Sequence, residues 1–188
     1  MNLPNKLTLL RVFMVPIFLV FALITEIPYN YLIAVAIFAI ASATDALDGH
    51  IARKNHLVTN FGKFLDPLAD KVLVMAAMLC LVDAKAISSV PVIIILAREF
   101  MVSGLRLVTA NDGIVVPAGI LGKLKTAFTM IAIIAIYVLM GLSGAGIDFG
   151  GFDIKIVYGI LIWIAAGLTI ISGAQYLWAY RKHIDTGK

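Results

Sequence analysis

The alternation of apolar and polar positions divides the chain into six long apolar stretches joined by short polar connections. Each stretch has about the 20 residues that a helix needs to cross a bilayer. The stretches cover residues 8–25, 30–52, 64–83, 88–110, 117–142 and 154–181. The last two are the clearest, because residues 126–147 and 156–180 contain no charge. The pattern therefore predicts an all-α integral membrane protein, a bundle of six transmembrane helices.

The first residues predict a short interfacial helix ahead of the first span. Leu3, Leu7 and Leu10 recur at helical spacing, and a polar stripe of Asn5, Thr8 and Arg11 accompanies them. Such a stripe serves either to cap the helix and anchor it among headgroups or to face a ligand, and both interpretations stay open. We see no internal repeat and no long linker, so we expect a single domain over residues 1–188.

Composition narrows the class of protein. Of the 188 residues, 62% are hydrophobic and 14% are charged, which is too apolar for a soluble monomer or a disordered chain. The single cysteine excludes a disulfide scaffold. The formal net charge of +4 does not require a nucleic-acid partner, because the positions of the basic residues account for it.

Basic residues gather on one side of the predicted bundle. With six spans, both termini share a side with the second and fourth connections. That side holds thirteen of the 15 lysines and arginines: Lys6, Arg11, Arg53, Lys54, Lys63, Lys71, Arg98, Arg106, Lys123, Lys125, Arg181, Lys182 and Lys188. The positive-inside rule then places both termini in the cytoplasm. Tyr176, Trp178 and Tyr180 fit an aromatic belt at that interface.

Four carboxylates lie at the edge of the spans. Asp45 and Asp48 follow the apolar run 31–41, while Asp66 and Asp70 open the third span. An ionisable group at bilayer depth costs roughly 2.5–3.5 kcal/mol on insertion scales, so such a group indicates a functional site. Spacings of three and four residues put each pair on one face of its helix. We therefore expect all four to meet at one depth.

Small residues surround these acids and leave room for a ligand. Gly49, Ala52 and Gly62 share the carboxylate faces, and Arg53 lies one turn beyond Gly49, where it can meet an anion. Four converging carboxylates repel one another unless cations intervene, and two Mg²⁺ or Mn²⁺ ions suit such oxygen ligands. A pair of ions of this kind can clamp a phosphoryl transfer, with one carboxylate left to deprotonate a hydroxyl nucleophile.

A structural interpretation competes with this site. Asp66 before Pro67 has the pattern of a helix cap followed by proline at the first helical position. Asp70 with Lys71, and the first two aspartates with Arg53, could form ordinary interfacial ion pairs. The whole constellation, with its glycines and arginine, favours the metal site.

These residues resemble a known signature. The segment reads Asp45-x₂-Asp48-Gly49-x₂-Ala52-Arg53-x₈-Gly62-x₃-Asp66-x₃-Asp70 and matches the CDP-alcohol phosphotransferase family in all eight fixed positions. The rest resembles one bacterial branch of that family, through Pro4-Asn5-x-Leu7-Thr8-x₂-Arg11, Ala97-Arg98-Glu99-Phe100, Gly104-Leu105-Arg106 and Gly122-Lys123-Leu124-Lys125-Thr126. The resemblance covers most of residues 1–130.

The resemblance implies a reaction and roles for these residues. A hydroxyl of glycerol 3-phosphate would attack CDP-diacylglycerol, giving phosphatidylglycerol phosphate and CMP. Asp45, Asp48, Asp66 and Asp70 would hold two divalent cations, with Asp70 also the general base. The nucleotide and pyrophosphate pocket would comprise Gly49, Ala52, Arg53, Gly62, Asn5 and Thr8. The enzyme would be a homodimer in the bacterial cytoplasmic membrane, with its active site facing the cytoplasm.

A second group of residues is the candidate for choosing the acceptor. Arg98, Arg106, Lys123 and Lys125 fall on the cytoplasmic side, and arginine binds phosphate oxygens in bidentate fashion. The competing interpretation is that these side chains snorkel to anionic lipid headgroups. The same chemistry on phosphatidylglycerol or an inositol phosphate also stays open. A divalent-cation transporter is a more remote alternative, because its acids would lie near the bilayer midplane.

Overall fold

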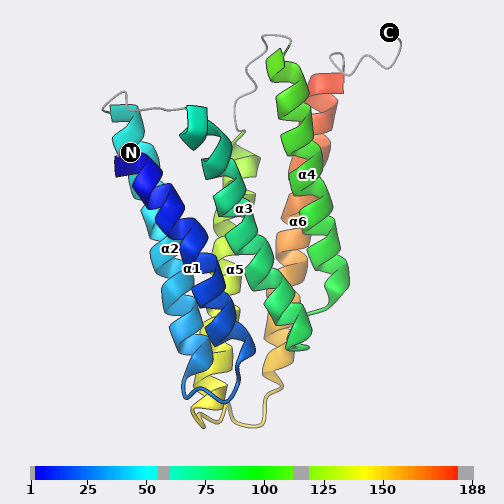
Figure 1. Ribbon diagram of the computed structural model, residues 1–188. Helices are drawn as coiled ribbons and strands as arrows, with labels where there is room; N and C mark the ends of the chain where they lie inside the picture. Colours follow the sequence, from blue (N-terminus) through cyan, green and yellow to red (C-terminus); the bar gives the residue numbers. More distant parts are fainter. Residues whose placement is uncertain (1–2, 55–59, 112–118, 182–188) are drawn as a thin grey trace. The chain divides into compact units, whose positions relative to one another are not determined.

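A computed structural model describes residues 3–54, 60–111 and 119–181 of the chain. Their side chains are described except at 3–8, 45–54, 60–67, 70, 107–108, 110–111 and 180. These residues form helices and no strand (Figure 1): α1 Leu3–Leu23, α2 Asn30–Lys54, α3 Asn60–Asp83, α4 Ser89–Asn111, α5 Ile120–Gly144 and α6 Ile154–Tyr180. Each apolar stretch thus contains one helix, with ends a few residues from those expected. The expected start of the fifth stretch, at residue 117, lies outside the described residues.

The N-terminal segment differs from the sequence expectation. The short interfacial helix is not a separate element, because α1 runs without interruption from Leu3 to Leu23. Pro4 stands in its first turn, where its missing N–H is not needed, and Pro16 lies within the helix without ending it. Buried apolar residues, including Val15 and Phe18 on either side of Pro16, hold the helix against its neighbours.

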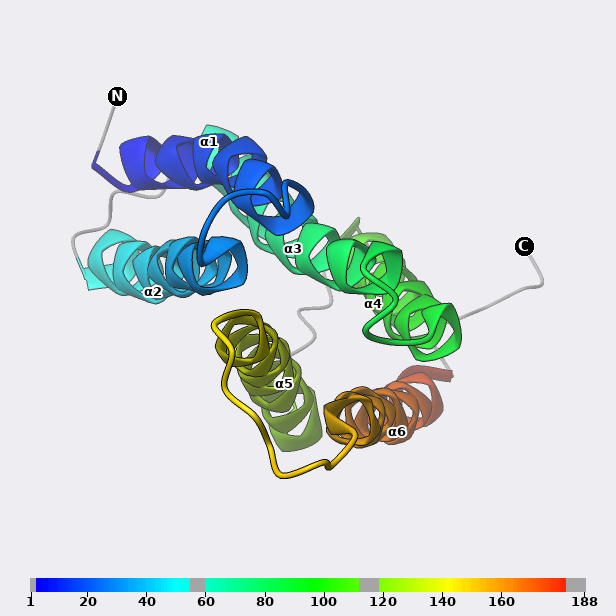
Figure 2. The ribbon, with the colours of Figure 1, turned by 90° about the horizontal axis from the view of Figure 1, so that it is seen from below.

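The described chain divides into two compact units, which leaves the expectation of a single domain a prediction. Unit 1 comprises residues 1–86 and 133–154. Within it, α1 packs against both α2 and α3 (Figure 2). The second half of α5 joins them through Tyr137, whose ring meets Phe18 edge-on at 5.6 Å and whose hydroxyl donates to the carbonyl of Ala77. Gly141 lies so close to Leu32 that a Cβ at residue 141 would be 2.5 Å from Cγ of Leu32.

Unit 2 comprises residues 87–132 and 155–188, and so contains α4, the first half of α5 and most of α6. Its buried apolar residues include Ile95, Ala132, Ile162 and Ala166. In both views of the ribbon, α4 and α6 run side by side (Figures 1 and 2). Polar contacts between these two helices build the cavity described below.

Two helices in the described part of the chain are long and apolar enough to cross a membrane, namely α5 and the segment Ile154–Ala179 of α6. Both leave large apolar side chains uncovered, such as Ile131 at 61% exposure and Ile171 at 58%. The core helix of a soluble protein would bury such residues. The expectation that these two stretches are the clearest span candidates is thus confirmed in length and composition.

The end of α5 depends on a left-handed residue. Gly146 has φ 87°, and it donates its N–H to the carbonyl of Ser143 while Ile147 donates to Leu142. This pair of bonds is the Schellman motif, which satisfies carbonyls that the helix end leaves without partners. Lys85 takes the same conformation (φ 53°) after α3, where a side chain makes it less favourable.

We predict that Gly146→Ala destabilises the protein by about 1 kcal/mol, because alanine must adopt the left-handed conformation. Gly144→Ala is the matched control, since Gly144 is the last residue of α5 and a Cβ there meets nothing within 4 Å. Thermal unfolding in detergent should show a lower midpoint for Gly146→Ala and an unchanged or raised midpoint for Gly144→Ala. Equal midpoints for the two variants would contradict the prediction.

Candidate functional site

The expected metal and nucleotide residues lie on three helices of unit 1. The second half of α2 holds Asp45, Asp48, Gly49, Ala52 and Arg53, and the first half of α3 holds Gly62, Asp66 and Asp70. Asn5 and Thr8 lie in the first turns of α1. The start of α1, the end of α2 and the start of α3 lie at the same end of unit 1 (Figure 1). The backbone therefore gives these positions the helical spacing and the common end that the motif requires.

The side chains of these ten residues lie outside the described ones. Among the side chains that the structure does describe, no three His, Cys, Asp or Glu residues form a group that could hold a metal ion. The metal and nucleotide assignments therefore stay predictions from the sequence.

The basic residues of unit 2 form a site whose side chains are described. A cavity of about 180 Å³ lies among α4, α6 and the residues at the start of α5. Its walls are Arg98, Arg106, Gly119, Gly122, Ser172, Gln175, Tyr176 and Ala179. Two of the four residues expected to bind the acceptor phosphate, Arg98 and Arg106, thus line one cavity.

Arg98 is fixed on both sides. Its Nη2 donates to Oγ of Ser172 on α6 at 2.7 Å, and its Nη1 donates to Oε1 of Glu99 at 3.4 Å. Its Nε is buried and has no hydrogen-bond partner among the described residues. The stem of the side chain lies against Gly173, where a Cβ would come 2.9 Å from Cγ of Arg98. Only 11% of the Arg98 side chain is exposed, so most of this side chain is buried against α6.

Lys125 approaches the same cluster from α5. Its ammonium group forms an ion pair with Oε1 of Glu99, and only 6% of the lysine side chain is exposed. Glu99 therefore bridges Lys125 and Arg98. Because burial makes an unpaired ammonium costly, this carboxylate stabilises Lys125 at its position.

Arg106 lies two turns beyond Arg98 on α4. Its Nε donates to the hydroxyl of Tyr176 at 2.9 Å, and its guanidinium carbon lies 5.4 Å from the centre of the same ring. No other hydrogen bond of Arg106 is seen among the described residues. The tyrosine therefore orients Arg106 from one edge and leaves the Nη edge for a ligand.

Positive charge exceeds negative charge among the described side chains at this site. Arg98 and Arg106 line the cavity, and beside Arg98 lies the ion pair of Lys125 with Glu99. Lys123, the fourth expected residue, is exposed near the start of α5 and is not among the cavity walls. A partly buried excess of positive charge with guanidinium donors on its walls is suited to an anion with several oxygens.

The contribution of α6 to this site was not predicted from the sequence. Tyr176, expected in an aromatic belt, is only 8% exposed and serves as the partner of Arg106. Trp178 is 69% exposed beside Arg181, so its surface position agrees with the expected belt. The available signal was a stripe of Thr169, Ser172 and Tyr176, three and four residues apart on an otherwise apolar helix. Such a stripe predicts a polar partner, but it does not identify one.

Comparison with known proteins identifies the class. The model of the CDP-alcohol phosphatidyltransferase family matches residues 1–171, which include both the aspartate signature and the basic residues of α4 and α5. The chain therefore belongs to the CDP-alcohol phosphatidyltransferase family.

Individual relatives are similar over nearly their whole length. The chain is 44% identical over 186 residues to the CDP-diacylglycerol–glycerol-3-phosphate 3-phosphatidyltransferase of Bacillus subtilis, covering 93% of each protein. It is 41% identical over 182 residues to the protein of the same name from Rickettsia bellii, covering 97% of each. A probable phosphatidylglycerophosphate synthase of Mycobacterium tuberculosis is 38% identical over 178 residues, covering 94% of this chain and 80% of that protein.

We predict that Glu99→Gln lowers the free energy of unfolding by about 1–3 kcal/mol, because it removes a negative charge paired with a buried ammonium. Lys125→Met should also destabilise, since it takes one cation from Glu99. The double variant Glu99→Gln/Lys125→Met should lose less free energy of unfolding than the two single variants lose together. A thermodynamic cycle on purified protein in detergent measures this coupling, and strictly additive losses would contradict the pairing.

Proposed function

We propose that this chain transfers the phosphatidyl group of CDP-diacylglycerol to glycerol 3-phosphate and releases phosphatidylglycerol phosphate and CMP. The names of the most similar relatives support this reaction. The observation that carries the acceptor assignment is the cavity that Arg98 and Arg106 line together. Two guanidinium groups on one small cavity suit a small phosphate ester, and they would suit a cationic alcohol poorly.

The donor site lies on unit 1. Its pocket for the cytidine and pyrophosphate is built from Asn5, Thr8, Gly49, Ala52, Arg53 and Gly62. Enzymes of the family generally depend on divalent cations. Asp45, Asp48, Asp66 and Asp70 would hold two such ions, Mg²⁺ or Mn²⁺, because all four offer the oxygen donors that these cations prefer. When bound, the two ions would supply charge neutralisation at the pyrophosphate.

The chain's own residues carry the other steps. Arg98, Arg106, Lys123 and Lys125 bind the phosphate of the acceptor, the first two directly at the cavity. Asp70 accepts the proton of the acceptor's hydroxyl as its oxygen forms a bond to the lipid-side phosphorus. The bond between that phosphorus and the CMP oxygen breaks, and CMP leaves with the bonding electrons. Anchoring the acceptor by its phosphate converts a collision of two substrates into a reaction between positioned groups.

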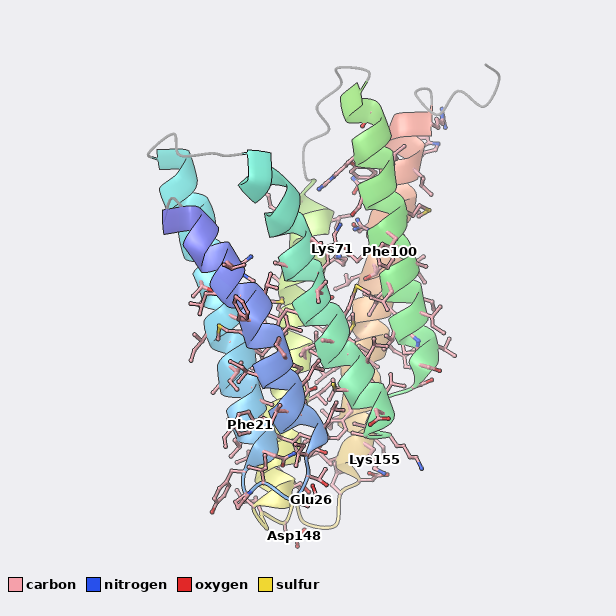
Figure 3. The ribbon with its side chains drawn as sticks, in the orientation of Figure 1. Phe21, Glu26, Lys71, Phe100, Asp148 and Lys155 are labelled. Carbon is pink, nitrogen blue, oxygen red and sulfur yellow. The ribbon has the colours of Figure 1, made fainter. Side chains whose placement is uncertain are left out.

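The protein lies in the bacterial cytoplasmic membrane with six spans and with both termini and the active site in the cytoplasm. Thirteen of the 15 basic residues support this orientation. In unit 1, Glu26 and Asp148 lie together at one end (Figure 3), opposite the end that holds the signature positions. Among the described residues at that end of unit 1, the acidic Glu26, Asp83, Asp148 and Asp153 outnumber Lys85, which fits the outer surface. The enzyme acts as a homodimer, as its family resemblance implies.

We predict that CMP is released from labelled CDP-diacylglycerol only when both glycerol 3-phosphate and a divalent cation are present. Removing the cation with EDTA should stop turnover, and adding Mg²⁺ or Mn²⁺ should restore it. A panel with phosphatidylglycerol, inositol 1-phosphate and glycerol tests the acceptor. Turnover with EDTA present would overturn the cation assignment, and faster turnover with another acceptor would overturn glycerol 3-phosphate. Cation uptake into proteoliposomes without CMP release would identify a transporter.

We predict that Asp70→Asn lowers kcat by about 10²–10⁴-fold, because the amide cannot accept the hydroxyl proton. Binding of CDP-diacylglycerol, measured by equilibrium dialysis in detergent, should change little. Asp148→Asn is the control, since this aspartate accepts a hydrogen bond from the N–H of Gly150 in an exposed loop and should leave kcat unchanged. Near-normal kcat in Asp70→Asn would assign the base elsewhere.

A further inference from the structure

We infer that the last turns of α6 are a positioning element for the acceptor site, in which Ser172, Gly173 and Tyr176 hold Arg98 and Arg106 in the geometry that receives a phosphate ester. This inference rests on the proposed function. None of the three residues takes part in the proposed chemistry. All three lie just beyond residue 171, where the match to the family model ends.

Two hydroxyl groups of α6 each accept a hydrogen bond from one of the two arginines. Ser172, 4% exposed, accepts from Nη2 of Arg98, and Tyr176, 8% exposed, accepts from Nε of Arg106. Each contact joins α6 to a residue of α4 more than 60 positions away in sequence. A buried hydroxyl that accepts from a guanidinium fixes the plane of that group, and the plane decides where its other N–H bonds point.

Gly173 makes the position of Arg98 possible. A Cβ at residue 173 would lie 2.9 Å from Cγ, 3.6 Å from Nε and 3.9 Å from Cδ of Arg98, so the arginine stem rests directly on the backbone of α6. Any larger residue would push the stem away from the helix and break the bond to Ser172. By contrast, a Cβ at Gly167, two turns earlier on α6, meets nothing within 4 Å.

The remaining donors match a phosphate ester. A guanidinium has five N–H groups. Arg106 uses Nε, which leaves both Nη groups as a forked pair for two phosphate oxygens. Arg98 uses one N–H on each Nη, which leaves the second N–H of each Nη, while its Nε is buried against α6. A side chain held in this way gives up less rotamer freedom on binding, so positioning improves affinity without adding a contact to the ligand.

The test compares Ser172→Ala and Tyr176→Phe with the wild-type enzyme. Each variant should raise KM for glycerol 3-phosphate about tenfold, which is the effect of losing one hydrogen bond to a charged group. The kcat and the KM for CDP-diacylglycerol should stay within twofold. Ser172→Thr keeps the hydroxyl and should restore most of the affinity. Gly173→Ala should resemble Ser172→Ala, whereas Gly167→Ala should not.

Matched controls separate positioning from packing. Thr169→Val removes a buried hydroxyl of α6 that bonds its own helix, and Tyr137→Phe removes a buried tyrosine hydroxyl of unit 1. Both should leave KM for glycerol 3-phosphate unchanged. In an Arg106→Met background, Tyr176→Phe should add almost nothing, because its effect acts through that arginine. An unchanged KM in Ser172→Ala and Tyr176→Phe, or an equal rise in the controls, would overturn the inference.

A binding measurement keeps this inference distinct from the proposed reaction. Glycerol 3-phosphate and inorganic phosphate should each raise the melting temperature of the wild-type protein, and the shift should shrink in Ser172→Ala and Tyr176→Phe. Phosphatidylglycerol in mixed detergent micelles tests a lipid phosphate instead: a shift with this lipid and none with glycerol 3-phosphate would overturn the assignment of a small phosphate ester. If the wild type binds these phosphates without turnover and the shift shrinks in both variants, the reaction is wrong and the positioning element stands. If the wild type turns over normally and the variants keep the full shift, the positioning element is wrong.

Discussion

The ion pair between Lys125 and Glu99 is the contact on which the basic site depends. It allows a buried ammonium to remain in an apolar helix, and the same carboxylate reaches Arg98. A buried ion pair contributes little net stability compared with apolar packing, but its geometry is specific. In this family member the pair brings α4 and α5 together, and the hydroxyl groups of α6 complete the enclosure of the two arginines.

The chemistry of the family is distributed over two parts of the chain. The aspartate signature lies on α2 and α3 in unit 1, and the arginines that suit a phosphate lie on α4 in unit 2. Under the roles proposed above, the residues for the donor can stay constant while the residues for the alcohol change, because the two sets lie on different helices.

Much of the fold followed from hydropathy, because each of the six apolar stretches largely coincides with one helix, in which the backbone N–H and C=O groups bond one another. The place of Arg98 and Arg106 in a candidate site was also predictable, because a charged residue within an apolar stretch is costly and therefore indicates a functional site. The ion pair of Glu99 could not be predicted, because the spacing of residues along α4 does not show that Lys125 of α5 lies next to Glu99. The hydrogen bonds of Ser172 and Tyr176 could not be predicted for the same reason. Their partners on α4 lie more than 60 residues away in the sequence, and only the folded structure brings them together.

The two contacts of Tyr176 with Arg106 have a consequence for which residues can occupy these positions. Tyr176 contacts this guanidinium both through its hydroxyl and through its ring, and a lysine could not donate to Tyr176 and offer a forked pair of donors at the same time. Positions 106 and 176 therefore act as one unit in the proposed acceptor site. A relative whose acceptor carries no phosphate would have no need of either residue, so we expect the two positions to differ together among such relatives.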